Sequence, residues 1–159
     1  MTSITHRNQS GFTLIEIVVV IVFIAILATV AVIRHKHVDP TLMSQTQVLK
    51  AHIRYAQMRS LSTDSNWGIK YQVNGDQSAY WLFKQPNTNN RIVLPGESED
   101  HVRLDQMGIV ISQGSFQVEF DGWGRPSSTL SGTGTLNLEL SNSDDSEQII
   151  VTQNTGFIP

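Results

Sequence analysis

The chain has 159 residues, no cysteine and a formal net charge of −3 at pH 7, from 11 lysines and arginines against 14 aspartates and glutamates. This mildly acidic balance argues against a general nucleic-acid-binding protein, whose affinity comes mainly from neutralising phosphates with basic side chains. Without cysteine there can be no disulfide and no thiolate zinc site, so any folded domain must be held together by packing.

An apolar run near the amino terminus contains a single charged residue. The run covers residues 12–33, and the charge belongs to Glu16. A helix of this length spans about 33 Å, which is enough to cross the hydrocarbon core of a bilayer. A carboxylate in such a segment costs roughly 2.5–3.5 kcal/mol, so we expect it to have a partner. A secretory signal peptide would place its cleavage site after the apolar region, whereas Gly11 precedes this one.

The residues around this boundary resemble a known processing signature. Gly11-Phe12-Thr13-Leu14-Ile15-Glu16 follows a short leader with one arginine and no acid, as in type IV pilins and the pseudopilins of type II secretion systems. The resemblance implies that a prepilin peptidase removes residues 1–11 as a leader, cutting between Gly11 and Phe12, and methylates the new amino terminus of Phe12.

The same resemblance implies an assembly role for Glu16. Its carboxylate would pair with the Phe12 amine of a neighbouring subunit inside the membrane, where a low dielectric strengthens the attraction. The alternative is local: Glu16 lies in the first helical turn, where free backbone N–H groups and the helix dipole satisfy a carboxylate.

The topology follows from the motif and not from charge counting. The leader offers Arg7 and His6, whereas residues 34–37 are all basic or histidine, which by the positive-inside rule alone would favour the opposite orientation. We expect a single pass through the inner membrane at 12–33, with a cytoplasmic amino terminus and a periplasmic carboxyl-terminal part. Many major pilins have a proline late in this segment, but the first proline here is Pro40.

A second helix is predicted beyond the apolar run. Asp39 is suited to cap it and Pro40 to occupy its first turn, and the predicted amphipathic helix covers 41–61. Its apolar residues recur on one side at helix-like spacing: Leu42, Leu49, Ile53 and Ala56. We assign 34–61 to an amphipathic continuation of the membrane helix, reached either through a bend at Pro40 or after a short break at 35–39.

Residues 62–159 are predicted to form an antiparallel β-sheet domain, because short runs of β-branched and aromatic residues alternate with turn residues. Asn74-Gly75-Asp76-Gln77 predicts a hairpin turn. Phe116, Val118 and Phe120 alternate with Gln117 and Glu119, which predicts a sheet with one face in water. The predicted strands are 67–73, 79–85, 91–94, 102–104, 109–112, 116–120, 135–140 and 148–153.

The fold class is therefore α+β, a long amino-terminal transmembrane helix packed on an antiparallel sheet domain, as in pilins. The later part of the chain also resembles the H-type minor pseudopilins and related minor pilins, including the C-type subunit of mannose-sensitive haemagglutinin pili. The segments that carry this resemblance are Ile53–Arg59, Asp121–Pro126, Gly132–Gly134, Ile149–Val151 and Gly156–Ile158.

No catalytic residue, cofactor or metal site is predicted, and the chain is not expected to be an enzyme. It has no Gly-x-Ser-x-Gly elbow for acyl transfer. Residues i and i+2 do not share a helix face, so interfacial solvation is favoured over metal binding for His35 and His37. The acidic loop with Asp144, Asp145 and Glu147 is interpreted as a solvated hairpin loop, with a Ca²⁺ loop as the alternative. The remaining histidines are His6, His52 and His101.

These observations predict a structural subunit, a minor pilin or pseudopilin that joins a tip or initiation complex. Its partners would be other pilin or pseudopilin subunits, the prepilin peptidase, the assembly platform and the inner membrane. The alternative is a membrane-anchored adhesin or ligand-binding module, with Trp81 and Trp123 as the first exposed aromatic candidates. A membrane-tethered enzyme is a third and weaker alternative, because the motifs for it are missing.

Overall fold

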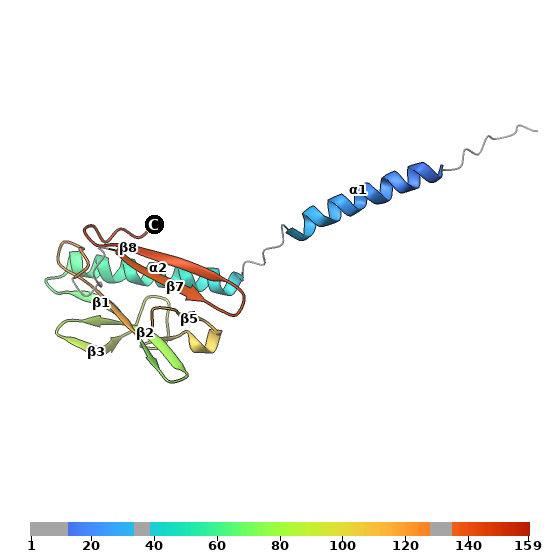
Figure 1. Ribbon diagram of the computed structural model, residues 1–159. Helices are drawn as coiled ribbons and strands as arrows, with labels where there is room; N and C mark the ends of the chain where they lie inside the picture. Colours follow the sequence, from blue (N-terminus) through green and yellow to red (C-terminus); the bar gives the residue numbers. More distant parts are fainter. Residues whose placement is uncertain (1–12, 34–38, 128–134) are drawn as a thin grey trace, which may run out of the picture. The chain divides into compact units, whose positions relative to one another are not determined.

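The computed structural model describes residues 13–33, 39–127 and 135–159 (Figure 1). They belong to two units, one that ends at His37 and one that begins at Val38. The first contributes a single helix, α1 (Leu14–Ile33). The second combines one helix with antiparallel sheets, so the α+β class is confirmed there.

Helix α2 (Pro40–Ser62) begins as the sequence predicts. Asp39 has an extended backbone, with φ −65° and ψ 111°, and its carboxylate accepts a hydrogen bond from the backbone N–H of Thr41 at 2.8 Å. Proline follows at the first helical position, where its missing N–H costs nothing. Because Asp39 is not helical, α2 starts with its own cap. The predicted helical continuation over 34–38 lies outside the described residues.

The apolar face of α2 is buried as the helical spacing predicts. Leu42, Leu49, Ile53 and Ala56 are all buried. Polar residues on the same face are hydrogen-bonded, as buried polar groups usually are: the Thr46 hydroxyl donates to the carbonyl oxygen of Leu42 at 2.8 Å. This face therefore provides a continuous packing surface along the helix.

The first sheet contains five antiparallel strands. Its strands run in the order β3-β2-β1-β6, and β4 also pairs with β2. Their bounds are β1 (Trp67–Asn74), β2 (Gln77–Lys84), β3 (Asn87–Ile92), β4 (Val102–Arg103) and β6 (Phe116–Phe120). The predicted β1–β2 hairpin turn is confirmed, with Gly75 at φ 59°, a conformation that favours glycine.

The remaining strands form a second sheet, which the sequence did not indicate. It has the order β5-β7-β8, from β5 (Val110–Ile111), β7 (Thr135–Ser141) and β8 (Ser146–Thr152). Between β4 and β5 the chain passes through a 3₁₀ turn, η1 (Asp105–Met107), and then Gly108 at φ 68°. This turn redirects the chain, so that β5 pairs Ile111 with Leu140 of β7 and does not extend the first sheet.

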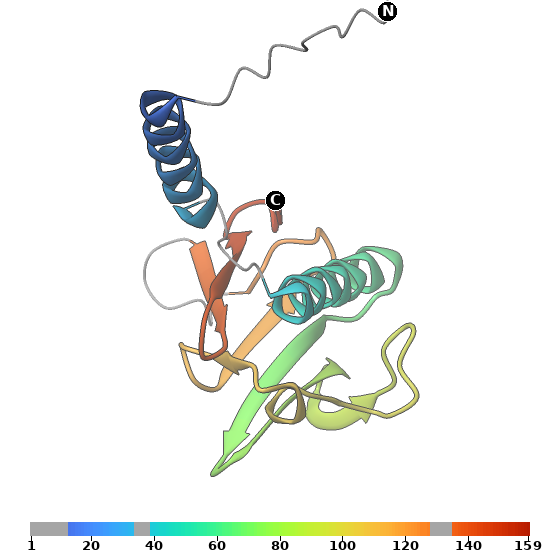
Figure 2. The same cartoon turned by 90° about the vertical axis from the view of Figure 1, so that its right-hand side faces the viewer.

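Helix α2 joins the two sheets into one core. It packs against β1 and β6 of the first sheet and against β7 and β8 of the second (Figures 1 and 2). Buried side chains from all three layers belong to a single apolar cluster, including Leu49, Ile53, Ile69, Tyr80, Leu138 and Val151.

One predicted strand is displaced. The expected strand at 91–94 is β3, which begins at Asn87 and ends at Ile92. The polar sequence Asn87-Thr88-Asn89-Asn90 has low strand propensity, but here it pairs with β2 as an edge strand after a tight turn at 85–86. The position of β3 is therefore determined by its pairing with β2 and not by the β-propensity of its own residues.

The prediction of one fully wet face on the first sheet is wrong in part. Phe116, Val118 and Phe120 do point to the core side. On the opposite face, however, Glu119 is buried, and it accepts hydrogen bonds from the side-chain amides of Asn66 and Gln85. The cover comes from residues distant in sequence, so alternation alone could not reveal it.

Gly68 explains how a large aromatic side chain is accommodated on this opposite face. Gly68 pairs directly with Phe83 on one side and Glu119 on the other. A Cβ atom at position 68 would lie 2.6 Å from the Phe83 ring and would also overlap the carbonyl oxygen of Val118. The ring of Phe83, which is fully buried, therefore occupies the space that a side chain on β1 would need.

We expect Gly68→Ala to destabilise the fold by about 1–3 kcal/mol, because the added methyl group forces the ring and a strand carbonyl apart. Urea unfolding of the full chain in a neutral detergent, followed by tryptophan fluorescence, measures this. Gly122→Ala is the matched control, since no atom outside residues 121–123 lies within 4 Å of its Cβ position, and it should change stability by less than about 0.5 kcal/mol. Equal stabilities for the two variants would contradict the packing argument.

Candidate functional site

The first turn of α1 contains Glu16, the predicted assembly residue. The backbone N–H of Glu16 donates to the carbonyl oxygen of Thr13 at 3.1 Å and lies 3.4 Å from its hydroxyl. Thr13 thus caps the helix, and Thr13 with Glu16 has the spacing of a capping box. This S/T-x-x-E pattern is the sequence signal for the cap, which the predictions above do not include. The position of Glu16 in the first turn agrees with the local alternative, in which the helix dipole favours its charge.

The surface of α1 is apolar and exposed over the side chains that are described, residues 13–28. The large apolar side chains of this stretch range from 45% exposed at Val19 to 80% at Leu14. Glu16 borders a shallow apolar depression that it forms with Ile17, Val20 and Ile21. A continuous apolar surface of this kind is typical of contact with lipid or with a partner protein.

Several predicted site residues lie outside the described part of the chain. These are the processing residues Gly11 and Phe12, the histidines His35 and His37, and the glycine-rich segment 132–134. The proposed pairing of the Phe12 amine with Glu16 is therefore not tested. Within the described segments, no helix meets both the length and the apolarity needed for a membrane crossing.

Three of the segments that resemble minor pseudopilins, 53–59, 121–126 and 156–158, lie together around Gln57 of α2. The Gln57 side-chain amide donates to the carbonyl oxygens of Gly124 at 2.8 Å and Thr155 at 3.3 Å. One turn away, the Arg54 guanidinium donates to the carbonyl oxygen of Ile158 at 2.8 Å. Segments far apart in sequence therefore form one hydrogen-bonded junction, which holds the carboxyl-terminal residues on α2.

The turn at 121–126 is hydrogen-bonded internally and displays an exposed aromatic ring. The Asp121 carboxylate accepts hydrogen bonds from the backbone N–H groups of Trp123 and Arg125, at 2.9 and 2.8 Å, and from the Arg125 side chain. Partial burial works to raise the pKa of Asp121, but these hydrogen bonds outweigh it and hold the pKa below its usual value. Trp123 is 78% exposed at the tip of this turn, with the Arg125 guanidinium 4.7 Å from its ring centroid.

The expectation that Trp81 is exposed is wrong. Only 3% of this residue is accessible, and its indole N–H donates to the carbonyl oxygen of Thr88 at 3.0 Å. Two cations from neighbouring strands approach its ring, with Lys70 at 5.6 Å and Arg91 at 4.6 Å from the centroid. Residues of β3 cover Trp81, and β3 begins four residues before the predicted strand at 91–94. Trp81 therefore has no exposed ring face on which a ligand could stack.

The acidic loop between β7 and β8 is organised by its own hydrogen bonds. Asn142 Oδ1 accepts from the backbone N–H groups of Asp144 at 3.0 Å and Asp145 at 2.8 Å. The Asn142 amide donates to the Asp39 carboxylate, which links this hairpin loop to the start of α2. Across the described ranges, no group of three or more His, Asp or Glu side chains is placed to hold a metal ion.

The two described histidines have different surroundings. His52 of α2 is buried, with Nδ1 3.0 Å from the Tyr80 hydroxyl and Nε2 3.2 Å from the carbonyl oxygen of Pro95. Burial lowers the pKa of His52 and raises the pKa of Tyr80, so the pair is neutral at pH 7. His101 is partly exposed beside Asp100, with Nδ1 2.7 Å from a carboxylate oxygen.

Comparison with protein families gives one match, to the prokaryotic N-terminal methylation motif over residues 6–32. This segment contains Gly11, Phe12, Glu16 and most of α1, and it is a short part of the chain. The motif supports a pilin-type subunit that is processed by a prepilin peptidase and assembles with other subunits. No curated protein and no solved structure matches the chain.

The burial of neutral His52 predicts a loss of stability in mild acid. Below its ordinary pKa of 6.5 the unfolded chain takes up a proton on His52 more readily than the folded chain does, so stability falls as pH decreases toward the lowered folded pKa. Urea midpoints of the full chain in detergent, measured between about pH 7.5 and pH 5.5, should fall less steeply for His52→Gln than for the wild type. If the urea midpoint of His52→Gln fell with pH as steeply as that of the wild type, His52 would not be the cause of the loss of stability in acid.

Proposed function

We propose that this chain is a minor pilin or pseudopilin, a structural subunit of a type II secretion pseudopilus or a type IV pilus. The observation that carries the proposal is an acid within the methylation motif that lies on an exposed apolar helix and has no partner among the described residues. The Glu16 carboxylate makes no hydrogen bond or ion pair to any described residue, and the contact of Glu16 with Thr13 is made by its backbone N–H. The first turn is therefore complete while the side chain stays available.

An intersubunit partner would solve the energetic problem of this acid. A carboxylate in an apolar environment needs a positive group nearby, and the attraction is strong where the dielectric is low. Cleavage after Gly11 would create such a group, the amine of Phe12, four residues before Glu16 in the sequence. Pairing across subunits would then select neighbouring α1 helices in register and join their apolar surfaces.

The location follows from the same segment. The apolar run around α1, in which Glu16 is the one charged residue, would anchor the chain in the inner membrane with its amino terminus in the cytoplasm and its globular unit in the periplasm. That unit has its own buried core, centred on α2, so it can be displayed outside the membrane while α1 packs with other subunits and contacts the assembly platform.

A place in the tip or initiation complex is supported by the resemblance to H-type minor pseudopilins and related minor pilins. Three of the segments that carry this resemblance meet at the junction around Arg54 and Gln57 of α2, through contacts to Gly124, Thr155 and Ile158. These hydrogen bonds join the segments, so the resemblance involves one connected part of the fold.

The alternative function, a membrane-anchored adhesin or ligand-binding module, keeps one of its two aromatic candidates. Trp123 is exposed on a turn fixed by Asp121, which is suitable for a stacking contact. Trp81 is buried and is therefore no longer a candidate for stacking on a ligand.

Mass spectrometry of the mature protein tests the processing step. The mature chain should begin at Phe12 and carry one methyl group on its amino terminus. Gly11→Val should retain residues 1–11, because a β-branched side chain blocks the close approach of the backbone to a protease. A native chain that keeps Met1 would contradict the proposal.

Substitution of Glu16 tests the assembly step. Glu16→Gln removes the charge but not the helix, so the subunit should stay in the membrane fraction while its amount in sheared filaments or cross-linked subunit complexes falls at least about tenfold, the equivalent of about 1.4 kcal/mol. Glu99→Gln, an exposed acid of the globular unit, is the control and should assemble normally. Normal incorporation of Glu16→Gln would refute the assembly role of this residue.

A further inference from the structure

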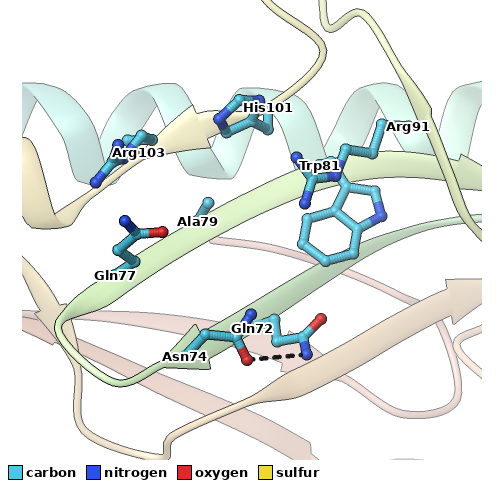
Figure 3. Close-up of a pocket in the computed structure, with 8 residues that line it drawn as sticks. All are labelled: Gln72, Asn74, Gln77, Ala79, Trp81, Arg91, His101 and Arg103. Atoms are coloured by element: carbon cyan, nitrogen blue, oxygen red, sulfur yellow. Dashed lines mark hydrogen bonds between the residues drawn. The ribbon is translucent and has the colours of Figure 1, made fainter.

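A small hollow opens on the outer face of the first sheet, across β1, β2 and β4 (Figure 3). Its floor is Ala79, which the strand register places between Arg103 of β4 and Gln72 of β1. Gln77 and Trp81 share the face of Ala79, because side chains alternate along a strand. The short side chain of Ala79 thus leaves a depression of about 100 Å³ surrounded by longer ones.

The lining of this hollow is rich in hydrogen-bond donors and contains no acidic residue. Arg91 of β3, His101 and Arg103 supply cationic or potentially cationic groups, and Gln72, Asn74 and Gln77 supply amides. Figure 3 shows these side chains around Ala79; they come from β1, β2, β3, β4 and the residue that precedes β4. Such a set favours a ligand with a negative charge and further acceptor oxygens.

The charges of the lining are compensated by neighbours, except for one. Arg103 pairs with Asp105, its Nε lying 3.3 Å from Oδ1, and this holds the pKa of Asp105 below its usual value. His101 is hydrogen-bonded to Asp100. Arg91 has no ion pair and no hydrogen bond to any residue that the structure describes, and its only recorded interaction is with the Trp81 ring. Of the lining cations, only Arg91 lacks a carboxylate partner among the described residues, and Glu99 also lies 3.9 Å from His101, so a singly charged anion suits the hollow better than a dianion.

Both guanidinium groups are held in place before any ligand arrives. Arg91 stacks on Trp81, whose indole N–H is fixed by its hydrogen bond to Thr88. Arg103 is fixed by Asp105, which also accepts a hydrogen bond from the backbone N–H of Ser78 at 3.2 Å. Less side-chain entropy is then lost on binding, and the planar fork of an arginine suits two carboxylate oxygens.

We propose that this hollow binds the carboxylate of a hydroxylated small acid, of the chemical class of sugar acids. Arg91 is the principal charged contact. The amide of Gln77 binds a neighbouring hydroxyl group, and so does that of Gln72, whose nitrogen also donates to Asn74 Oδ1 at 3.2 Å (Figure 3). The volume accommodates the carboxylate and the atoms next to it, and the rest of the ligand extends into solvent. This site is independent of the assembly role of Glu16, and its test does not require subunits to assemble.

Calorimetric titration of the full chain in a neutral detergent, at about 0.15 M salt, tests the proposal with three probes. Galacturonate presents a carboxylate with hydroxyl groups, galactose presents hydroxyl groups alone, and inorganic phosphate presents a largely dianionic group. We expect galacturonate to bind at least about tenfold more tightly than galactose, which lacks the charged hydrogen bond, and more tightly than phosphate. Equal binding of galacturonate and galactose, or tighter binding of phosphate, would overturn the proposal.

Variants locate the binding in the hollow. Arg91→Gln should weaken galacturonate binding at least about tenfold, and Arg91→Lys should weaken it less, because the charge remains without the planar fork. Arg125→Gln is the matched control: Arg125 also stacks on a tryptophan, Trp123, but lies elsewhere, so affinity should change by less than about twofold. Gln77→Ala removes an exposed side chain from the lining and should weaken binding several-fold without affecting the fold. Unchanged affinity in both Arg91→Gln and Gln77→Ala would show that the hollow is not the site.

Discussion

The packing of one face of α2 against two sheets is the interaction on which the globular unit depends. The chain has no cysteine, so no disulfide can hold the layers together. Leu49 and Ile53 of α2 contribute to the same buried cluster as Ile69 of the first sheet and Val151 of the second. Because neither sheet is large, burial of apolar surface against a shared helix is what makes the two sheets one domain.

The polar hydrogen bonds of α2 complete this arrangement at its ends and along its side. Asp39 caps the start of the helix and also receives the Asn142 amide from the β7–β8 hairpin. Arg54 and Gln57 bind backbone carbonyl groups of the carboxyl-terminal segment. Directional bonds of this kind contribute little net free energy each, but they fix which segments meet the helix and where. The same helix thus provides both the apolar contact and the register of the chain around it.

The two units of the protein place their apolar residues in opposite ways. The globular unit buries them under α2, whereas the described side chains of α1 expose them, with Glu16 as the one acid among them. This contrast separates two functions. Assembly would belong to α1, which needs a lipid or protein environment, and recognition would belong to the sheet, whose outer face carries a preorganised set of arginine and amide groups. A subunit of this plan could vary its outer face without disturbing the helix that joins it to other subunits.

Much of the fold could be predicted from local signals in the sequence. Asp39-Pro40 and the spacing of Leu42, Leu49 and Ile53 predicted α2, because a cap and a 3.6-residue period are local properties. The alternation in 116–120 and the turn at Asn74-Gly75 predicted β6 and the first hairpin for the same reason. The methylation motif is equally local: the residues from Gly11 to Glu16 indicate a pilin-type subunit without any tertiary contact.

What remained depended on contacts between distant residues, and only the tertiary structure decided it. The division into two sheets depends on the turn at η1 and on the pairing of Ile111 with Leu140. The burial of Trp81 depends on β3, a polar strand that forms because β2 is beside it. The hollow over Ala79 exists because register places Arg103 and Gln72 on either side of a small residue. The sequence by itself therefore determined the elements and the processing motif, since their periods and caps are encoded within a few residues. The tertiary structure determined the outer face of the sheet, since its side chains come from four separate segments.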